Sequence, residues 1–213
     1  MKNKIALFDF DGVIADTEPL YDIFWNEAAI RYNVGIDNFA SVIKGTIMPN
    51  IMKQYFSSYP QEAQAQLLKE SADFEESMSF PLIKGSLDFV KLLKNNGVLV
   101  GLVTSSHSGK IEKAIKVLNI PSLFDTIVTA DHITEGKPHP MCYQLAAKDL
   151  NVAPQDCIVF EDSFAGIQAG TDAGMRVIGI SSTNAEDKLK DKVYAVIENF
   201  EGLTWDNYIH YSK

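Results

Sequence analysis

The sequence predicts an α/β protein: a doubly wound, Rossmann-like parallel sheet with an α-helical segment inserted after the first strand. Three observations support this prediction. Short apolar runs without polar alternation recur along the chain, which is typical of strands buried on both faces of a parallel sheet. Amphipathic helical patterns separate these runs. The alternation stops between about residues 18 and 79, where only helical patterns occur.

Five apolar runs are expected to form the strands of the sheet. They are short, bounded by polar or turn residues, and too short to be helices of ordinary length. They cover residues 5–8, 98–103, 126–129, 157–160 and 176–180.

Helices are expected between and after these strands. Each is marked by a residue that can cap or start it, or by apolar residues three and four positions apart. The first expected helix lies between Ser86 and Gly97, and the second carries Ile111, Ala114, Ile115 and Leu118 on its apolar face. The third begins at Pro140, and the fourth lies between Ser163 and Gly174. Residues 205–213 are expected to form a closing helix with a frayed end.

The insertion divides the chain into two expected domains: a catalytic core of residues 1–16 and 80–213, and a helical cap domain of residues 17–79. Helical patterns in the insertion cover residues 20–32, about 48–57, and 61–78, and prolines separate them. Ligands of an open α/β sheet bind beyond the carboxyl ends of the strands. Because the insertion leaves the sheet at that edge, we expect it to lie over the ligand as a lid.

The charge of the chain excludes several classes of partner. Its 213 residues carry 19 Lys and Arg against 28 Asp and Glu, a formal net charge of -9. Such a surface repels nucleic acid and anionic membranes, so neither is expected as a partner. Cys142 and Cys157 are interpreted as buried apolar residues, and the absence of a signal peptide or spanning segment predicts a cytoplasmic protein.

Two carboxylates follow the first expected strand. Asp9 lies between two phenylalanines, and an ionised carboxylate there is costly unless it is paired, hydrogen-bonded or bound to a cation. Asp11 is two residues later, so the two side chains can converge. A turn at Asp11-Gly12 would explain the second aspartate but leaves Asp9 unexplained. The pair therefore indicates a functional site.

Three more polar clusters lie at the ends of other strands or in the loops beyond them. They are Thr104-Ser105-Ser106, Lys137-Pro138 and Glu161-Asp162. Taken singly, each has an ordinary explanation as a loop, a solvated lysine or acids at a helix N-terminus. Together with the aspartates they supply a nucleophile, hydroxyl groups, a cation and metal ligands at one edge of the sheet.

With these motifs in this order, the chain resembles the haloacid dehalogenase superfamily, in its β-phosphoglucomutase-like and sugar-phosphate phosphatase branch with a helical cap. The resemblance covers nearly the whole chain. The residues that carry it are Asp9-Phe10-Asp11-Gly12-Val13, Thr104, Gly136-Lys137-Pro138 and Phe160-Glu161-Asp162-Ser163-Phe164-Ala165-Gly166-Ile167.

The resemblance implies an enzyme with Mg²⁺ as its cofactor. Asp9 would be the nucleophile that forms an aspartyl-phosphate, and would also bind the metal. Asp11 would act as general acid and base with its side chain, and would offer the metal only its backbone carbonyl. Asp162 would bind the metal directly and Glu161 through water.

The resemblance also implies a phosphate site. Thr104, Ser105, Ser106 and Lys137 would hold the phosphoryl oxygens, together with neighbouring backbone N–H groups such as that of Gly12. Three further residues each have two possible roles. Thr17, at the hinge of the cap, either hydrogen-bonds near the site or caps a helix. Lys44 either contacts substrate or is solvated, and His107 either touches phosphate or begins a helix in solvent.

The cap departs from the pattern of the mutases. Tyr21 stands where these enzymes carry a histidine, and Met48 stands where an arginine grips the distal phosphate, although Lys44-Gly45 matches. The sequence therefore favours hydrolysis of a small phosphomonoester, a sugar phosphate, with β-phosphoglucomutase activity as the alternative. A haloacid dehalogenase and a non-catalytic binding module are weaker alternatives. The active sites of this layout are complete in one chain, so a monomer is expected.

Overall fold

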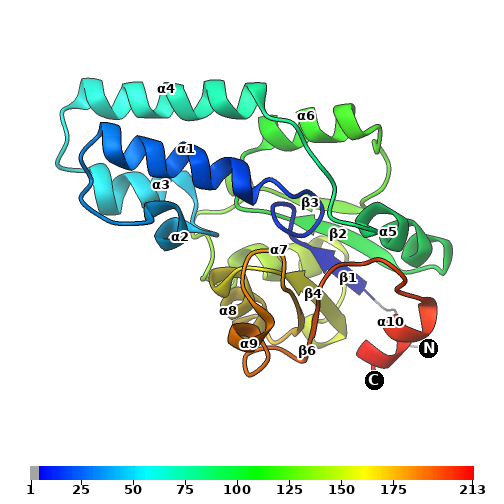
Figure 1. The fold of residues 1–213 in the computed structure, drawn as a ribbon. Coiled ribbons are helices and arrows are strands. Elements are labelled where there is room, and N and C mark those ends of the chain that lie inside the picture. The colour runs from blue at the N-terminus through cyan, green and yellow to red at the C-terminus, as the bar shows by residue number, and fades with distance from the viewer. Residues whose placement is uncertain (1–4) are drawn as a thin grey trace.

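The computed structural model describes residues 5–213. Its centre is a six-stranded parallel sheet in the order β3-β2-β1-β4-β5-β6, with helices on both faces (Figure 1). The strands are β1 (Ile5–Phe8), β2 (Leu99–Val103), β3 (Thr126–Val128), β4 (Cys157–Glu161), β5 (Arg176–Ile180) and β6 (Ala195–Ile197). The predicted fold class is confirmed. The sequence did not indicate β6, because its three residues are only half-buried at the edge of the sheet.

The position of β1 in the middle of the sheet explains why a site forms there. Phe8, its last residue, is in register with Leu102 of β2 on one side and Phe160 of β4 on the other. The residues that follow these three strands therefore emerge side by side. The backbone N–H of Asp9 continues the ladder for one more hydrogen bond, to the carbonyl of Phe160 at 3.1 Å.

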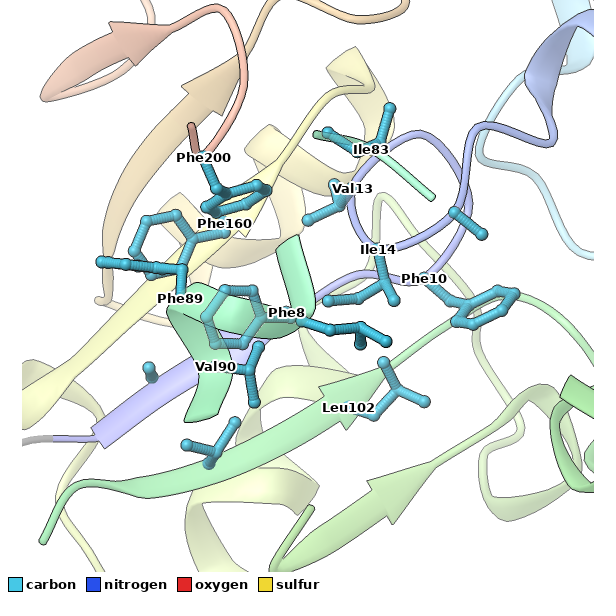
Figure 2. Close-up of a cluster of buried hydrophobic side chains, with 14 of the residues drawn as sticks. Phe8, Phe10, Val13, Ile14, Ile83, Phe89, Val90, Leu102, Phe160 and Phe200 are labelled. Carbon is cyan, nitrogen blue, oxygen red and sulfur yellow. The ribbon is translucent and has the colours of Figure 1, made fainter. Parts of the chain in front are cut away.

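Aromatic packing holds the central strands in place. The rings of Phe8 and Phe160 stack with their centroids 4.6 Å apart, and Phe89 and Phe200 surround them (Figure 2). All four are buried in the larger of the two core clusters of the sheet. Aromatic pairs at this spacing add about 0.5–1.5 kcal/mol beyond the burial of their area. The strand ends that carry the polar residues are thus fixed by a rigid core.

Helices cover the two faces of the sheet. One face packs against α5 (Ser86–Asn95), α6 (Ser108–Leu118) and α10 (Trp205–Tyr211), and the other against α7 (Met141–Asp149), α8 (Phe164–Asp172) and α9 (Glu186–Leu189). Two 3-10 turns, η2 (Ala130–His132) and η3 (Pro154–Asp156), complete the connections. Cys142 and Cys157 are buried and free, as expected.

The predicted helix starts are confirmed at two positions and wrong at one. The hydroxyl of Ser163 accepts a hydrogen bond from the N–H of Gly166 at 3.0 Å, and Pro140 directly precedes α7. Ser86, however, is the first residue of α5 and makes no cap. Gly85 takes the capping position, and the Ser86 hydroxyl donates to the carbonyl of Ile14 at 2.9 Å. Tertiary contact with the loop after β1 thus overrides the local capping preference.

Between β1 and α5 lies a helical segment, residues 18–77, which we call the inserted segment. Its helices are α1 (Glu18–Arg31), α2 (Phe39–Ile43), α3 (Met48–Ile51), which continues into the π-helical turn η1 (Met52–Phe56), and α4 (Gln61–Ser77). The five-residue α2 was not predicted, because one turn and a half is too short to show a helical period. Among the described residues no helix has the length and apolarity needed to cross a membrane.

The inserted segment has a small hydrophobic core of its own. This core is a cluster of buried residues separate from those of the sheet, and it includes Phe24, Trp25, Phe39, Phe56 and Leu67. The two ends of the segment meet, because the N–H of Asp16 donates to the carbonyl of Pro81 at 2.7 Å. In Figure 1 its helices lie beyond the edge of the sheet at which β1 ends.

Candidate active site

Three buried acidic side chains meet where β1 and β4 end. Carboxylate oxygens of Asp9, Glu161 and Asp162 lie within 4.8 Å of one another. Burial raises the pKa of Asp9 to about 8, with the nearby Lys137 opposing and Glu161 adding to the rise. Burial, and next the charge of Glu161, also raises the pKa of Asp162 well above its ordinary value. An all-oxygen cluster that resists carrying its own negative charge fits a hard divalent cation such as Mg²⁺.

Glu161 is held by hydrogen bonds on both of its carboxylate oxygens. One accepts from Lys137 Nζ at 2.5 Å and from the Tyr143 hydroxyl at 3.0 Å. The other accepts from the backbone N–H groups of Asp162 and Ser163, both at 3.0 Å, and from the Ser163 hydroxyl at 3.1 Å. Because these donors surround the carboxylate, Glu161 fixes the loop that carries Asp162 and orients Lys137.

The backbone of α8 approaches Glu161 too closely to accept a side chain. A Cβ atom at Gly166 would overlap both carboxylate oxygens of Glu161. We expect Gly166→Ala to lower the free energy of unfolding by about 2–3 kcal/mol through this overpacking. Thr171→Ala, on an exposed position of the same helix, should change it by less than about 0.5 kcal/mol. Urea unfolding of the two variants checks this, and equal stabilities would contradict it.

Lys137 supplies a cation to the acidic cluster. Its side chain is buried, and Nζ lies 3.0 Å from Asp9 Oδ1 and 2.5 Å from Glu161 Oε1. Nζ also donates to the carbonyl of Val103 at 3.3 Å. Burial by itself would lower the pKa of Lys137, but the charges of Asp9 and Glu161 outweigh it and hold the pKa above its ordinary value. One ammonium group is thus shared by two carboxylates.

Asp11, two residues after Asp9, has hydrogen-bond partners of its own. Its carboxylate accepts from the hydroxyls of Thr17 and Ser106, the latter at 2.8 Å, and from Lys110 Nζ at 2.5 Å. Burial would raise the pKa of Asp11, but Lys110 and the two hydroxyls together lower it, so the group is ionised. Thr17 stands at the start of α1 but makes no capping bond. Of the two roles considered for Thr17, a helix cap and a hydrogen bond near the site, the structure therefore shows the hydrogen bond.

Lys110 was missed by the sequence analysis. It lies in the first turn of α6 with its side chain fully buried, and Nζ also contacts the hydroxyls of Ser106 at 3.0 Å and Tyr21 at 2.8 Å. A signal was present, because Lys110 precedes Ala114 by four residues and so lies on the apolar face of the helix. A lysine on such a face needs an acidic partner.

The remaining predicted residues lie around the cluster. Thr104 is buried after β2, and its hydroxyl accepts from the N–H of Ser106 at 3.1 Å. The Ser105 hydroxyl donates to the carbonyl of Gly45 at 3.0 Å, which joins this loop to the inserted segment. Gly12 has a φ of +74° and passes so close to Asp162 that a Cβ atom would overlap its carboxylate.

A cavity of about 380 Å³ lies between the sheet edge and the inserted segment. Asp9, Asp11, Thr104 and Asp162 line it from the core. The residues that line it from the inserted segment include Glu18, Tyr21, Asp22, Trp25, Lys44, Met48, Leu68 and Glu75. A pocket of this size takes a small molecule with its reacting group at the acidic cluster.

Further contacts hold the inserted segment against the core around this pocket. His107 Nε2 lies 2.5 Å from Glu75 Oε2 of α4, so His107 contacts the inserted segment. Within the inserted segment, the Tyr21 hydroxyl donates to the other oxygen of this carboxylate, Glu75 Oε1, at 2.7 Å. Lys113 donates to backbone carbonyls just beyond, including that of Met78 at 3.2 Å. His107 and Lys113 of the core thus both contact the inserted segment at or beyond the C-terminal end of α4.

Comparison with known proteins agrees with this geometry. The family model for haloacid dehalogenase-like hydrolases matches residues 6–180. Validoxylamine A 7'-phosphate phosphatase from Streptomyces hygroscopicus subsp. limoneus is 31% identical over 194 residues, which cover 88% of this chain and 90% of that protein. Hexitol phosphatase B from Escherichia coli (strain K12) is 29% identical over 192 residues, 85% of each chain.

The fold comparison gives the same result. The crystal structure of β-phosphoglucomutase from Clostridium difficile matches with a TM-score of 0.82 at 25% identity and covers 98% of both chains. The family match includes the ends of β1, β2 and β4 and the loop with Lys137, which together form the site. The chain thus belongs to the haloacid dehalogenase-like hydrolases, in the β-phosphoglucomutase-like branch, and is a phosphatase or phosphomutase.

Proposed function

We propose that this protein is a Mg²⁺-dependent phosphatase that hydrolyses a small phosphomonoester, a sugar phosphate, through an aspartyl-phosphate on Asp9. The observation that carries the proposal is the position of Asp9. It faces the cavity, lies beside the ammonium group of Lys137, and shares an oxygen cluster with Asp162. The named relatives act on phosphorylated hexitols and on validoxylamine A 7'-phosphate, which supports a small hydroxylated substrate.

The metal would be held by the carboxylates of Asp9 and Asp162 and by the backbone carbonyl of Asp11. Glu161, whose oxygens already accept several hydrogen bonds, would contribute through water. When bound, Mg²⁺ would neutralise negative charge on the phosphoryl group and on the carboxylates around it. The side chains of the site would then position the phosphoryl group for transfer.

The transferred phosphoryl group would be held by Thr104, Ser105, Ser106 and Lys137, with the N–H of Gly12. Asp9 Oδ attacks phosphorus while the bond from phosphorus to the leaving oxygen breaks, and Asp11 gives that oxygen a proton. Asp11 then removes a proton from water, whose oxygen attacks phosphorus and releases Asp9 and inorganic phosphate. The proton that Asp11 takes from water replaces the one it gave to the leaving oxygen, so its protons balance over one turnover. Lys110 and the hydroxyls favour the ionised form of Asp11 that this second step requires.

We further propose that residues 17–79 act as a cap domain on a core of residues 1–16 and 80–213. The separate hydrophobic core of the inserted segment and its closely spaced ends support this division. Closure over the bound phosphomonoester would exclude bulk water from Asp9 while the phosphoryl group is transferred. Every proposed site residue comes from one chain, so we expect a monomer, and we propose a cytoplasmic location.

Contacts in the pocket favour hydrolysis over the mutase reaction. Tyr21 bonds to Glu75 and Lys110, and so provides no counterpart of an acid-base histidine. Lys44 is paired with Glu18 and Asp22, and the neighbouring Met48 has no charge with which to hold a distal phosphate. A phosphatase needs neither of these functions.

Hydrolysis of p-nitrophenyl phosphate tests the proposal. We expect release of phosphate with Mg²⁺, a loss of roughly 100-fold or more after chelation, and recovery when Mg²⁺ is restored. A dehalogenase would instead attack 2-chloropropionate without the metal, and a binding module would do neither. A mutase would convert β-glucose 1-phosphate to glucose 6-phosphate in the presence of the bisphosphate. Any of these three results would refute the phosphatase assignment.

A further inference from the structure

The half of the pocket formed by the inserted segment is acidic. Three carboxylates line it, those of Glu18, Asp22 and Glu75. Among the described residues that line the pocket, Lys44 is the only lysine or arginine. The charge that the leaving group meets therefore depends on whether Lys44 is free to contact it.

Lys44 is already occupied by two carboxylates from the first turns of α1. Its Nζ lies 3.0 Å from Glu18 Oε2 and 3.0 Å from Asp22 Oδ1. The Lys44 and Glu18 side chains are 18% and 15% exposed, so solvent screens their pairing only partly. One cation between two anions leaves this cluster with a net charge of about -1.

A second phosphate on the substrate would meet this cluster without a free cation to receive it. Repulsion of this kind is a common means of specificity, because it costs the wrong ligand more than it costs the right one. Hydroxyl groups, in contrast, can donate hydrogen bonds to the same carboxylate oxygens. Apolar pocket residues are available for a carbon skeleton: Trp25, Ile43, Met48, Ile51 and Leu68.

We infer that Glu18 and Asp22, by holding Lys44 between them, restrict this site to phosphomonoesters whose leaving group is hydroxylated and carries no second phosphate. The inference rests on the proposed function for the reacting phosphate and adds to it the chemistry of the leaving group. Glu18 and Asp22 are specificity-determining residues in this account, and Lys44 is unavailable as a phosphate ligand.

Calorimetric binding to the Asp9→Asn variant with Mg²⁺ tests the inference without turnover. The probes are fructose 1-phosphate and fructose 1,6-bisphosphate, which differ by one phosphate. We expect the bisphosphate to bind about 10-fold more weakly or worse. Equal or tighter binding of the bisphosphate, or no measurable binding of fructose 1-phosphate, would overturn the inference.

Variants in the same background assign the effect to the two carboxylates. Glu18→Gln with Asp22→Asn releases Lys44. It should lower the ratio of the Kd of the bisphosphate to the Kd of fructose 1-phosphate by about 10-fold. Adding Lys44→Met should abolish that gain, because the released cation is then lost. Glu27→Gln removes a charge from α1 at a side chain that is 65% exposed, and should leave the ratio unchanged.

The outcomes separate this inference from the proposed function. If Glu27→Gln shifts the ratio as much as the double variant does, the effect is one of general charge and the inference fails. If wild-type protein with Mg²⁺ hydrolyses no phosphomonoester, the proposed function fails, whereas the Kd ratios still decide the inference. If hydrolysis occurs but the ratios show no discrimination, only the inference fails.

Discussion

Asp9→Asn is expected to lower kcat for hydrolysis of p-nitrophenyl phosphate by about 10⁴-fold or more, with the fold intact. The amide cannot form the acyl-phosphate, and it also removes a carboxylate from the buried cluster with Glu161 and Asp162. Asp88→Asn, at a side chain that is 89% exposed, is the matched control and should retain full activity. A rate near that of wild type in the Asp9→Asn variant would exclude Asp9 as the nucleophile.

The same variant should change how stability depends on pH when no metal is present. In the folded protein the pKa of Asp9 is raised from 3.8 to about 8, so between these values the folded state holds a proton that the unfolded chain has released. The contribution of Asp9 to the free energy of unfolding is fully present below pH 3.8 and is lost as the pH rises through 8. Metal-free wild type should therefore lose more in Tm between pH 5 and pH 8 than Asp9→Asn does, as scanning calorimetry can measure.

Lys137→Met is expected to lower the free energy of unfolding by about 3–5 kcal/mol and the activity by about 100-fold or more. Lys137 is the ammonium group that Asp9 and Glu161 share, at 3.0 and 2.5 Å, and its removal leaves these two buried carboxylates without their shared cation. Lys91→Met, at a side chain that is 56% exposed, should change stability by less than about 0.5 kcal/mol.

A double variant keeps this prediction testable if Lys137→Met fails to fold. Adding Glu161→Gln removes one of the two unpaired charges, so part of the lost stability should return while the activity stays low. Denaturant unfolding and p-nitrophenyl phosphate assays measure the two effects separately. Unchanged stability of Lys137→Met, or a double variant less stable than the single one, would show that the shared ion pair does not stabilise the fold.

The sequence indicated the core of the site because its signals are local. Asp9, Thr104 and the pair Glu161-Asp162 each stand directly after an apolar run, and parallel strands bring their carboxyl ends to one edge. The order of motifs then placed Lys137 beside them, where the structure has it. Elements with a weak local signal were missed: β6 has three residues and α2 has five. Their conformations depend on the surfaces against which they pack.

Apolar periodicity and the polar residues beside it thus encode the α/β core, the longer inserted helices and the acidic residues at the strand ends. The pairing of charges, in contrast, follows from the three-dimensional packing of the chain. Lys110 reaches Asp11 across 99 positions of the chain, and Lys44 reaches Asp22 across 22, through the docking of one part on another. Coulomb energy depends on distance in space and on burial, and neither quantity can be read from positions along the chain.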